Sequence, residues 1–273
     1  MGEPRDPIRV EQRDGGVALL TFDDPERRNA MTEAMGTALS AAVEQLAVDP
    51  ALRVVVLTGA GHAFSAGGDL GMIEAKAEAG RAAPGDPARA TQRDSMLDFY
   101  RLFLAVRELP CPTLAALNGA AIGAGLAVAL ACDLRIASRE ARLGLNFSRL
   151  GIHPGMGSSW TLPRLVGPAH AADLLFTGRI VSGEEAERLG MVNRAVDPEA
   201  VLPEALAWAE QIAACAPIAV RGTKRALAQS LDASLEDQLA FEAQEQALCY
   251  ESVDLAEGLA AARARRAPHF EGN

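Results

Sequence analysis

Short apolar runs, separated by polar loops, mark the strands expected in this chain. Residues 54–59 (VVVLTG) form a β-branched run that is typical of a strand buried on both faces. Residues 17–22 (VALLTF), 113–117 (TLAAL) and 134–136 show similar patterns. Such near-continuous runs are typical of parallel sheets that are covered on both sides.

Apolar positions at helical spacing lie between these runs. Residues 32–46 place Met35, Leu39, Val43 and Leu46 on one helix face, and residues 91–109 form an amphipathic helix that Pro110 ends. Residues 126–132 predict an apolar helix, and another begins at residues 70–79. The Ala-, Gly- and Pro-rich residues 78–90 predict a flexible surface insert. The alternation of strands and helices predicts an α/β core with largely parallel pairing.

Beyond Gly157 the pattern becomes mostly helical. We expect helices over residues 168–177, 182–190, 201–213, 218–229, 235–250 and 253–265. Asp197-Pro198 is the expected boundary between a core, residues 1–197, and a C-terminal helical region, residues 198–273. No repeat recurs at a fixed period of about 20–50 residues.

Charge and composition narrow the class of partner. The 273 residues carry a formal net charge of −10, which argues against nucleic acid and anionic membranes, so a phosphate-bearing ligand would need a local basic patch. Four scattered cysteines without a CxxC pair predict free, buried thiols in a reducing compartment. The polar start predicts no secretory leader, and no apolar run reaches the roughly 18 residues of a membrane helix. We therefore expect a cytoplasmic protein, and no residue spacing indicates a metal site.

Candidate chemistry lies in two stretches that share one design. Residues 54–70 and 113–130 each run from a buried strand through a turn of small residues into a helix. Free N–H groups at two such turns can converge on one oxygen and form an oxyanion hole. The alternative is that the glycines only shape the turns and that Asp69 only caps a helix. Gly119, Gly123 and Gly125 do not fit GxGxxG, and no GxxxxGK[ST] motif exists, so nucleotide-binding motifs are excluded.

Longer motifs identify a family resemblance. They are residues 25–31 (PERRNAM), 61–70 (GHAFSAGGDL), 111–137, 149–167 (RLGIHPGMGSSWTLPRLVG), 177–196 and 257–270. With these motifs the chain resembles the crotonase (enoyl-CoA hydratase/isomerase) superfamily over nearly its full length. The resemblance implies an α/β fold, a spiral of ββα units with a C-terminal helical trimerisation region. It also implies homotrimers or hexamers, an acyl-CoA thioester as substrate and no tightly bound cofactor.

The resemblance also implies roles for particular residues. The N–H groups of Gly68 and Ala124 would form the oxyanion hole, which requires a negative φ at Ala124. The residues implied to contact CoA are Arg28, Ala30, Ala66, Asp69 and Leu70, although Arg28 can also be read as a solvated loop arginine. Arg265, Arg266 and Phe270 would close the site over CoA, in this subunit or a neighbouring one.

Two positions depart from the family's hydratases. In the hydratases that the chain resembles, catalytic glutamates occupy the positions where this chain has Ala127 and Phe147. Neither an alanine nor a phenylalanine side chain can transfer a proton. Both are expected to line the pocket, and Phe147 predicts an apolar acyl chain. Tyr100 and His153 are the candidate replacements, each with a structural reading as the alternative. Weaker candidates are Glu74, Ser148 and Arg149, of which Arg149 could hold a substrate carboxylate.

Three hypotheses remain open from the sequence. In the first, an acyl-CoA enzyme stabilises a thioester enolate and performs decarboxylation, thioester hydrolysis or a double-bond shift. In the second, the chain is a true enoyl-CoA hydratase with an unidentified acid and base. In the third, it binds acyl-CoA without catalysis.

Overall fold

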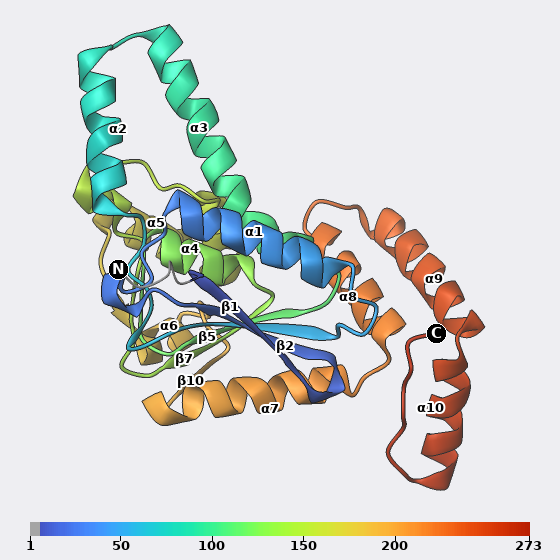
Figure 1. The fold of residues 1–273 in the computed structure, drawn as a ribbon. Coiled ribbons are helices and arrows are strands. Elements are labelled where there is room, and N and C mark those ends of the chain that lie inside the picture. The colour runs from blue at the N-terminus through green and yellow to red at the C-terminus, as the bar shows by residue number, and fades with distance from the viewer. Residues whose placement is uncertain (1–5) are drawn as a thin grey trace.

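The structure is a computed structural model that describes residues 6–273. Its larger sheet has the order β1-β2-β3-β5-β7-β10 (Figure 1). The strands are β1 (Ile8–Arg13), β2 (Val17–Phe22), β3 (Val54–Gly59), β5 (Thr113–Leu117), β7 (Leu134–Ser138) and β10 (Arg194–Val196). Only β1 is antiparallel to its neighbour within this sheet, so the expected parallel core is confirmed.

A second sheet of very short strands has the order β4-β6-β8-β9. The strands are β4 (Ala63–Ser65), β6 (Ala120–Ile122), β8 (Arg142–Gly144) and β9 (Val181–Ser182). Each of β3, β5 and β7 is followed by one of these short strands and then by a helix, which produces successive ββα units. The predicted α/β fold of ββα units is therefore confirmed. Strands of two or three residues are too short to show a periodic pattern, and the sequence did not indicate them.

Helices cover both faces of the larger sheet. On one face lie α1 (Glu33–Ala47) and α4 (Ala124–Ala131), and on the other lies α7 (Val201–Ala213) (Figure 1). Successive residues of β2 pack into different apolar clusters on the two faces of the sheet. For example, Val17 packs in the cluster that contains α7, whereas Leu20 packs in the main core. Burial on both faces explains the continuous apolar runs. α7 follows the boundary predicted at residue 198, but it packs on the larger sheet. The helices that do not cover this sheet therefore begin only after α7.

Two helices project from the body as a hairpin (Figure 1). They are α2 (Leu70–Ala82) and α3 (Asp86–Leu104), and three residues join them. The prediction of a flexible insert over residues 78–90 is therefore wrong. Alanine favours helix on both sides of the turn, Gly85 takes a φ of 131° within it, and Pro87 is accommodated in the first turn of α3.

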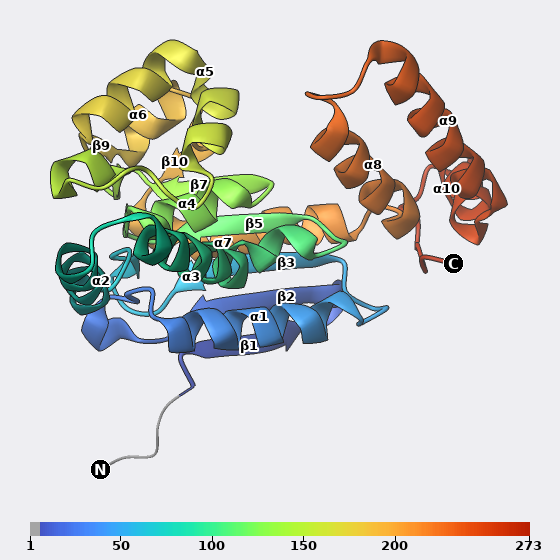
Figure 2. The same cartoon turned by 90° about the horizontal axis from the view of Figure 1, so that it is seen from above.

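The remaining helices lie beside and beyond the sheets (Figure 2). α6 (Gly183–Arg188) packs against β8 and β9 of the smaller sheet, and α5 (Ser158–Thr177) packs against α4 and residues 146–150. α8 (Pro217–Gln229), α9 (Leu235–Glu251) and α10 (Val253–Ala264) form the C-terminal region. Lys224 of α8 joins this region to the body through Asp133, at 2.9 Å, and through the carbonyl oxygen of Cys111, at 2.8 Å.

Two further observations concern the chain as a whole. Within residues 6–273, no helix combines the length and apolar character needed to cross a membrane. The four cysteines are free thiols, as predicted, but the prediction that they are buried holds only for Cys111 and Cys132, because Cys215 is exposed and Cys249 is partly exposed. Burial raises the pKa of the Cys111 and Cys132 thiols, which makes both poor nucleophiles.

Candidate active site

The first glycine turn joins β4 to α2. Gly67 has a φ of 92°, a conformation that residues with a side chain rarely adopt. A Cβ there would also lie 2.4 Å from the carbonyl oxygen of Ile122, so both the backbone conformation and the available space require glycine. Asp69 caps α2 by accepting a hydrogen bond from the Met72 N–H at 2.9 Å. The backbone of this turn is therefore pressed against the second glycine turn.

The second turn joins β6 to α4. Gly123 takes a φ of 52°, and α4 begins at Ala124, which has no positive φ. The condition that the sequence analysis placed on Ala124 is therefore met. A Cβ on Gly67 would lie 3.6 Å from the Ala124 nitrogen, so the two turns are in direct contact.

Both turns offer backbone N–H groups to the same space. Met31 pairs with the first turn by donating to the Gly67 carbonyl oxygen at 2.8 Å and accepting from the Asp69 N–H at 3.3 Å. This pairing leaves the Gly68 N–H without a hydrogen bond to Met31. Within residues 6–273, neither the Gly68 N–H nor the Ala124 N–H meets an acceptor. Both groups are therefore available to an oxygen atom of a ligand, and Ala124 lies where the helix dipole favours negative charge.

The loop of residues 24–31 closes over the first turn because Asn29 anchors it. Asn29 is fully buried and donates to the carbonyl oxygens of Ala60, at 3.0 Å, and Ala63, at 2.8 Å. The Ala66 N–H donates to the Arg28 carbonyl oxygen at 2.8 Å. These contacts hold Arg28 and Ala30 at the edge of a cavity.

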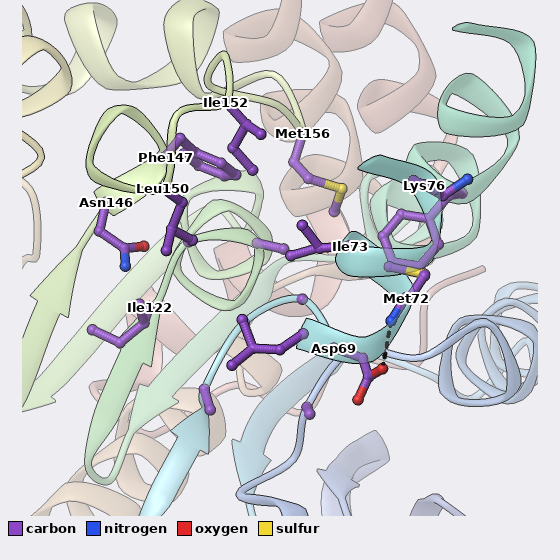
Figure 3. Close-up of a pocket in the computed structure, with 18 of the residues that line it drawn as sticks. Asp69, Met72, Ile73, Lys76, Ile122, Asn146, Phe147, Leu150, Ile152 and Met156 are labelled. Carbon is purple, nitrogen blue, oxygen red and sulfur yellow. Dashed lines mark hydrogen bonds between the residues drawn. The ribbon is translucent and has the colours of Figure 1, made fainter. Parts of the chain in front are cut away.

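That cavity has a volume of about 810 Å³ and opens onto both turns (Figure 3). The sequence-predicted residues that line it are Arg28, Ala30, Ala66, Gly68, Asp69, Leu70, Tyr100, Ala124, Phe147 and His153. Its volume is in the range of small-molecule sites. The structure thus brings residues from five separate parts of the chain to one place.

Other predicted residues lie outside the cavity. Ala127 is fully buried on α4 and does not reach the cavity wall, so the expectation that it lines the pocket is corrected. Glu74 is exposed on α2, Ser148 is exposed, and Arg149 donates to the Thr177 carbonyl oxygen at 2.8 Å; none of the three lines the cavity.

The C-terminal residues named by the resemblance also lie outside the cavity of their own chain. Arg266 pairs with Glu257, and Phe270 packs 3.5 Å from the place where a Cβ on Gly258 would lie. Arg265 ends α10 in the left-handed region and is also absent from the cavity wall. A role for these three residues in a neighbouring subunit stays a prediction.

One side of the cavity is charged. Its charged residues on the loop and on α2 are Glu26, Arg27, Arg28, Asp69 and Lys76. The Met72 N–H, and after it Arg27 at 2.6 Å, hold the pKa of the Asp69 carboxyl below its usual range. Arg28 has no ion-pair partner among the described residues, and Lys76 donates to Ser95 Oγ at 2.9 Å. This side therefore has positive charge available to an anionic ligand.

The opposite side is apolar (Figure 3). Phe147, Leu150, Ile152 and Met156, which follow β8, face Met72 and Ile73 of α2, while Met96 and Phe99 of α3 complete the wall. Of these residues, only Phe147 was predicted from the sequence. The helical spacing of Gln92, Met96, Phe99 and Tyr100 was a signal that could have found the α3 part.

Three neutral polar side chains interrupt the apolar side: Tyr100 and His153, which were predicted, and Asn146, which was not (Figure 3). Burial raises the pKa of Tyr100, whose hydroxyl has no hydrogen-bond partner within residues 6–273. His153 is exposed toward the cavity, and its Nδ1 lies 2.8 Å from the Pro154 carbonyl oxygen. Because a carbonyl oxygen only accepts, Nδ1 carries the hydrogen and Nε2 is left as an acceptor in the neutral ring.

Carboxylates are absent from the apolar side. Among the described residues that line the cavity, Glu26 and Asp69 are the carboxylates, and both belong to the charged side. No group of three or more His, Cys, Asp or Glu residues in the described chain is placed to hold a metal ion. The chemistry available on the apolar side is therefore that of backbone N–H groups, the Tyr100 hydroxyl, the His153 imidazole and the Asn146 amide.

Comparison with known proteins gives a consistent result. The model of the family "Enoyl-CoA hydratase/isomerase" matches residues 12–273. A Thermus thermophilus protein named "Putative enoyl-CoA hydratase" is 42% identical over 96% of this chain and 100% of its own length. The Bos taurus "Enoyl-CoA hydratase domain-containing protein 2, mitochondrial" is 37% identical over 94% of this chain and 85% of its own. The crystal structure of an enoyl-CoA hydratase from Bacillus anthracis superposes with a TM-score of 0.88 at 34% identity, covering 98% of this chain and 100% of that one. The chain therefore belongs to the enoyl-CoA hydratase/isomerase family, within the crotonase superfamily.

Proposed function

We propose that the cavity binds an acyl-CoA thioester and that the N–H groups of Gly68 and Ala124 hold the thioester oxygen. The observation that carries the proposal is that these two N–H groups lack acceptors in the described chain and lie on touching turns at the cavity wall. Removal of a proton from Cα would place negative charge on the thioester oxygen. Preorganised N–H donors stabilise such charge without further reorganisation.

The charged side fits the CoA part of the ligand. Arg28 and Lys76 carry positive charge that no carboxylate among the described residues neutralises, and Leu70 is 63% exposed beside the first turn. CoA phosphates need cationic partners, and its pantetheine arm can cover an exposed leucine. The roles of Ala30 and Ala66 in holding CoA through backbone groups belong to the same proposal.

Among the reactions of an enolate, the site favours a shift of a double bond over the addition of water. Hydration requires one group that activates water and a second that protonates Cα, and the apolar side contains no carboxylate pair. A shift needs only one proton carrier. His153 Nε2 would take a proton from Cα of a 3-enoyl thioester, and the electron pair would delocalise onto the oxygen held by Gly68 and Ala124. Return of the proton to Cγ would give the conjugated 2-enoyl thioester, with no water consumed.

A second candidate is the loss of CO₂ from a malonyl-type thioester. The observation in its favour is the same carboxylate-free wall, with Phe147 only 8% exposed, because decarboxylation forms the enolate without a base. An apolar wall also disfavours the charged carboxylate and favours neutral CO₂.

The test is incubation of the protein with a 3-enoyl-CoA in D₂O, followed by NMR and mass spectrometry. The proton that the exposed His153 takes from Cα can exchange with D₂O before a proton is delivered to Cγ, so we expect conjugated product with deuterium at Cγ. We also expect a rate reduced about 100-fold or more in His153→Ala, and no change in the control His170→Ala, whose side chain is exposed on α5. Release of CO₂ from malonyl-CoA without any double-bond shift would support the second candidate instead. Rapid hydration of crotonyl-CoA would contradict both candidates, and tight binding without any turnover would identify an acyl-CoA-binding protein.

Cellular location and assembly remain predictions. We propose that the protein is cytoplasmic and that it assembles as a homotrimer or hexamer. The exposed leucines on α9 support the assembly, with Leu235 75% and Leu239 56% exposed. Analytical ultracentrifugation would test the assembly.

A further inference from the structure

Tyr100 brings a hydroxyl group into the apolar side of the cavity. It lies near the base of α3, where that helix packs against α4, and it is partly exposed. Met96, Phe99 and Met156 line the same side. No described residue donates to or accepts from this hydroxyl. The proposed double-bond shift does not use it either.

The position of the hydroxyl is fixed by Gly155. A Cβ on Gly155 would lie 2.5 Å from Tyr100 Oη and 2.9 Å from Cζ, closer than real contacts allow. Gly155 has no positive φ, so its backbone conformation does not require glycine. The missing Cβ instead makes room for the tyrosine ring. The hydroxyl is thus seated against this loop at the cavity wall.

An unpaired hydroxyl at this place affects which acyl groups bind. In the free protein, water can satisfy it. A purely hydrocarbon chain would displace that water and leave the hydroxyl without a partner, which lowers affinity by about 10- to 100-fold relative to a chain that pairs with it. Burial also raises the pKa of Tyr100, so the hydroxyl remains a neutral donor near pH 7.

We propose that Tyr100 forms a polar subsite and that the acyl group carries a carbonyl or hydroxyl oxygen that accepts its hydrogen bond. The substrate class is thus an oxygenated acyl-CoA rather than a plain hydrocarbon one. This inference rests on the proposed function, because it assumes that the cavity holds an acyl-CoA. The assignment gives Tyr100 a role in selecting the substrate, whereas His153 moves the proton.

The experiment measures affinity by calorimetry for four CoA esters of equal chain length: hexanoyl-, 3-hydroxyhexanoyl-, 5-hydroxyhexanoyl- and 5-oxohexanoyl-CoA. We expect the full-length protein to bind at least one oxygenated ester about 10-fold or more tightly than hexanoyl-CoA. Tyr100→Phe keeps the ring that packs on Gly155 and should reduce this ratio to nearly one. The matched control is Tyr250→Phe, which alters the other tyrosine, 71% exposed on α9 and outside the cavity; it should leave the ratio unchanged.

The outcomes separate this inference from the proposal on which it rests. Equal binding of all four esters by the unaltered protein, or a preference that survives in Tyr100→Phe, would overturn the polar subsite while leaving acyl-CoA binding intact. Failure of any CoA ester, and of CoA itself, to bind would contradict the proposed function and with it the subsite.

Discussion

The side chain of Ser65 occupies the space directly over Gly125: a Cβ on Gly125 would lie 2.7 Å from the Ser65 Cβ. Ser65 is fully buried, and its Oγ donates to the Asn29 carbonyl oxygen at 2.7 Å and accepts from the Gly67 N–H at 3.1 Å. One small side chain therefore connects the loop of residues 24–31, the turn before α2 and the start of α4. These are the segments that position the proposed oxyanion hole.

Replacement of Ser65 by alanine should therefore affect catalysis more than ligand binding. The change leaves the buried Asn29 carbonyl oxygen and Gly67 N–H without this partner, at a cost of about 1–3 kcal/mol in the free energy of unfolding. It also loosens the turn that aims the Gly68 N–H. We expect kcat for the double-bond shift to fall about 10-fold or more while KM changes little, because the donors act mainly on the developing charge.

Thr58→Val is the matched control for Ser65→Ala. Thr58 is 5% exposed, and its Oγ1 donates to the Ala116 carbonyl oxygen at 3.0 Å within the larger sheet; neither residue lines the cavity. Denaturant unfolding should show destabilisation in both variants, whereas only Ser65→Ala should lower kcat. An equal fall of kcat in both would indicate that Ser65 acts only through general stability.

The sequence predicted the buried core well because its signals are local. The helix over residues 201–213 and the strands over residues 17–22, 54–59 and 113–117 have the bounds that were expected. The edge strand β1 was not expected, because most of its residues are partly or fully exposed and its sequence is mainly polar. The α2–α3 hairpin was predicted as a flexible insert because Gly85 and Pro87 are as compatible with a tight turn between two helices as with a loop.

Prediction of the site depended on how it is built. Glycine turns form a recognisable motif, and through the family resemblance this motif led to Gly68 and Ala124, both of which line the cavity. The apolar wall is assembled by tertiary packing of α2, α3 and the segment after β8, and no local pattern shows which helix faces meet. Ala127 is a second example: the family motif gives its position in the sequence, but does not show whether its methyl group reaches the cavity, and in the structure Ala127 is fully buried.

Asp69 should make stability depend on pH in the acid range. The Met72 N–H and Arg27 lower the pKa of this carboxyl in the folded chain. Its stabilising contribution is therefore complete above the unfolded-state pKa of about 4 and is lost as the pH falls through the lower folded-state value. The difference in unfolding free energy between the unaltered protein and Asp69→Asn, measured by denaturant titration, should be constant near neutral pH and shrink below about pH 4.

Asp98→Asn provides the comparison for Asp69→Asn. Asp98 forms an exposed ion pair with Arg101 one helical turn away, so its removal should cost only a few tenths of a kcal/mol. A difference for Asp69→Asn that grows as the pH falls would show that the folded chain raises this pKa, contrary to the structure.

Arg28 should contribute to binding of CoA through charge. Its side chain lines the cavity and has no ion-pair partner among the described residues. Because the group is exposed, Arg28→Gln should weaken binding of CoA esters by only about 1 kcal/mol, or roughly five-fold. The loss should be largest at low ionic strength, since salt screens exposed charges. Arg89→Gln, which removes an exposed arginine of α3 outside the cavity, should have no effect on affinity. Unchanged affinity in Arg28→Gln at low salt would identify Arg28 as a solvated loop residue.

Asp254 should fasten the C-terminal tail to α10. It is 2% exposed, and its carboxylate accepts from the N–H groups of Glu271, at 2.7 Å, and Gly272, at 3.0 Å. The Val253 N–H also donates to the Asn273 oxygen at 3.0 Å. Asp254→Ala should lower the free energy of unfolding by about 1–3 kcal/mol, because buried hydrogen-bonding groups lose their partners.

A double-mutant cycle tests whether this loss comes from the tail. Deletion of residues 271–273 removes the same two donors, so the deletion and Asp254→Ala should be clearly less than additive in thermal and denaturant unfolding. The deletion alone should be more harmful than its short length suggests, because it leaves a buried carboxylate without those donors. Affinity for CoA esters should stay the same in all variants, since neither Asp254 nor the tail lines the cavity of its own chain. Additive losses of stability would show that Asp254 supports α10 independently of the tail, and a loss of affinity would instead indicate that the tail reaches the site of a neighbouring subunit.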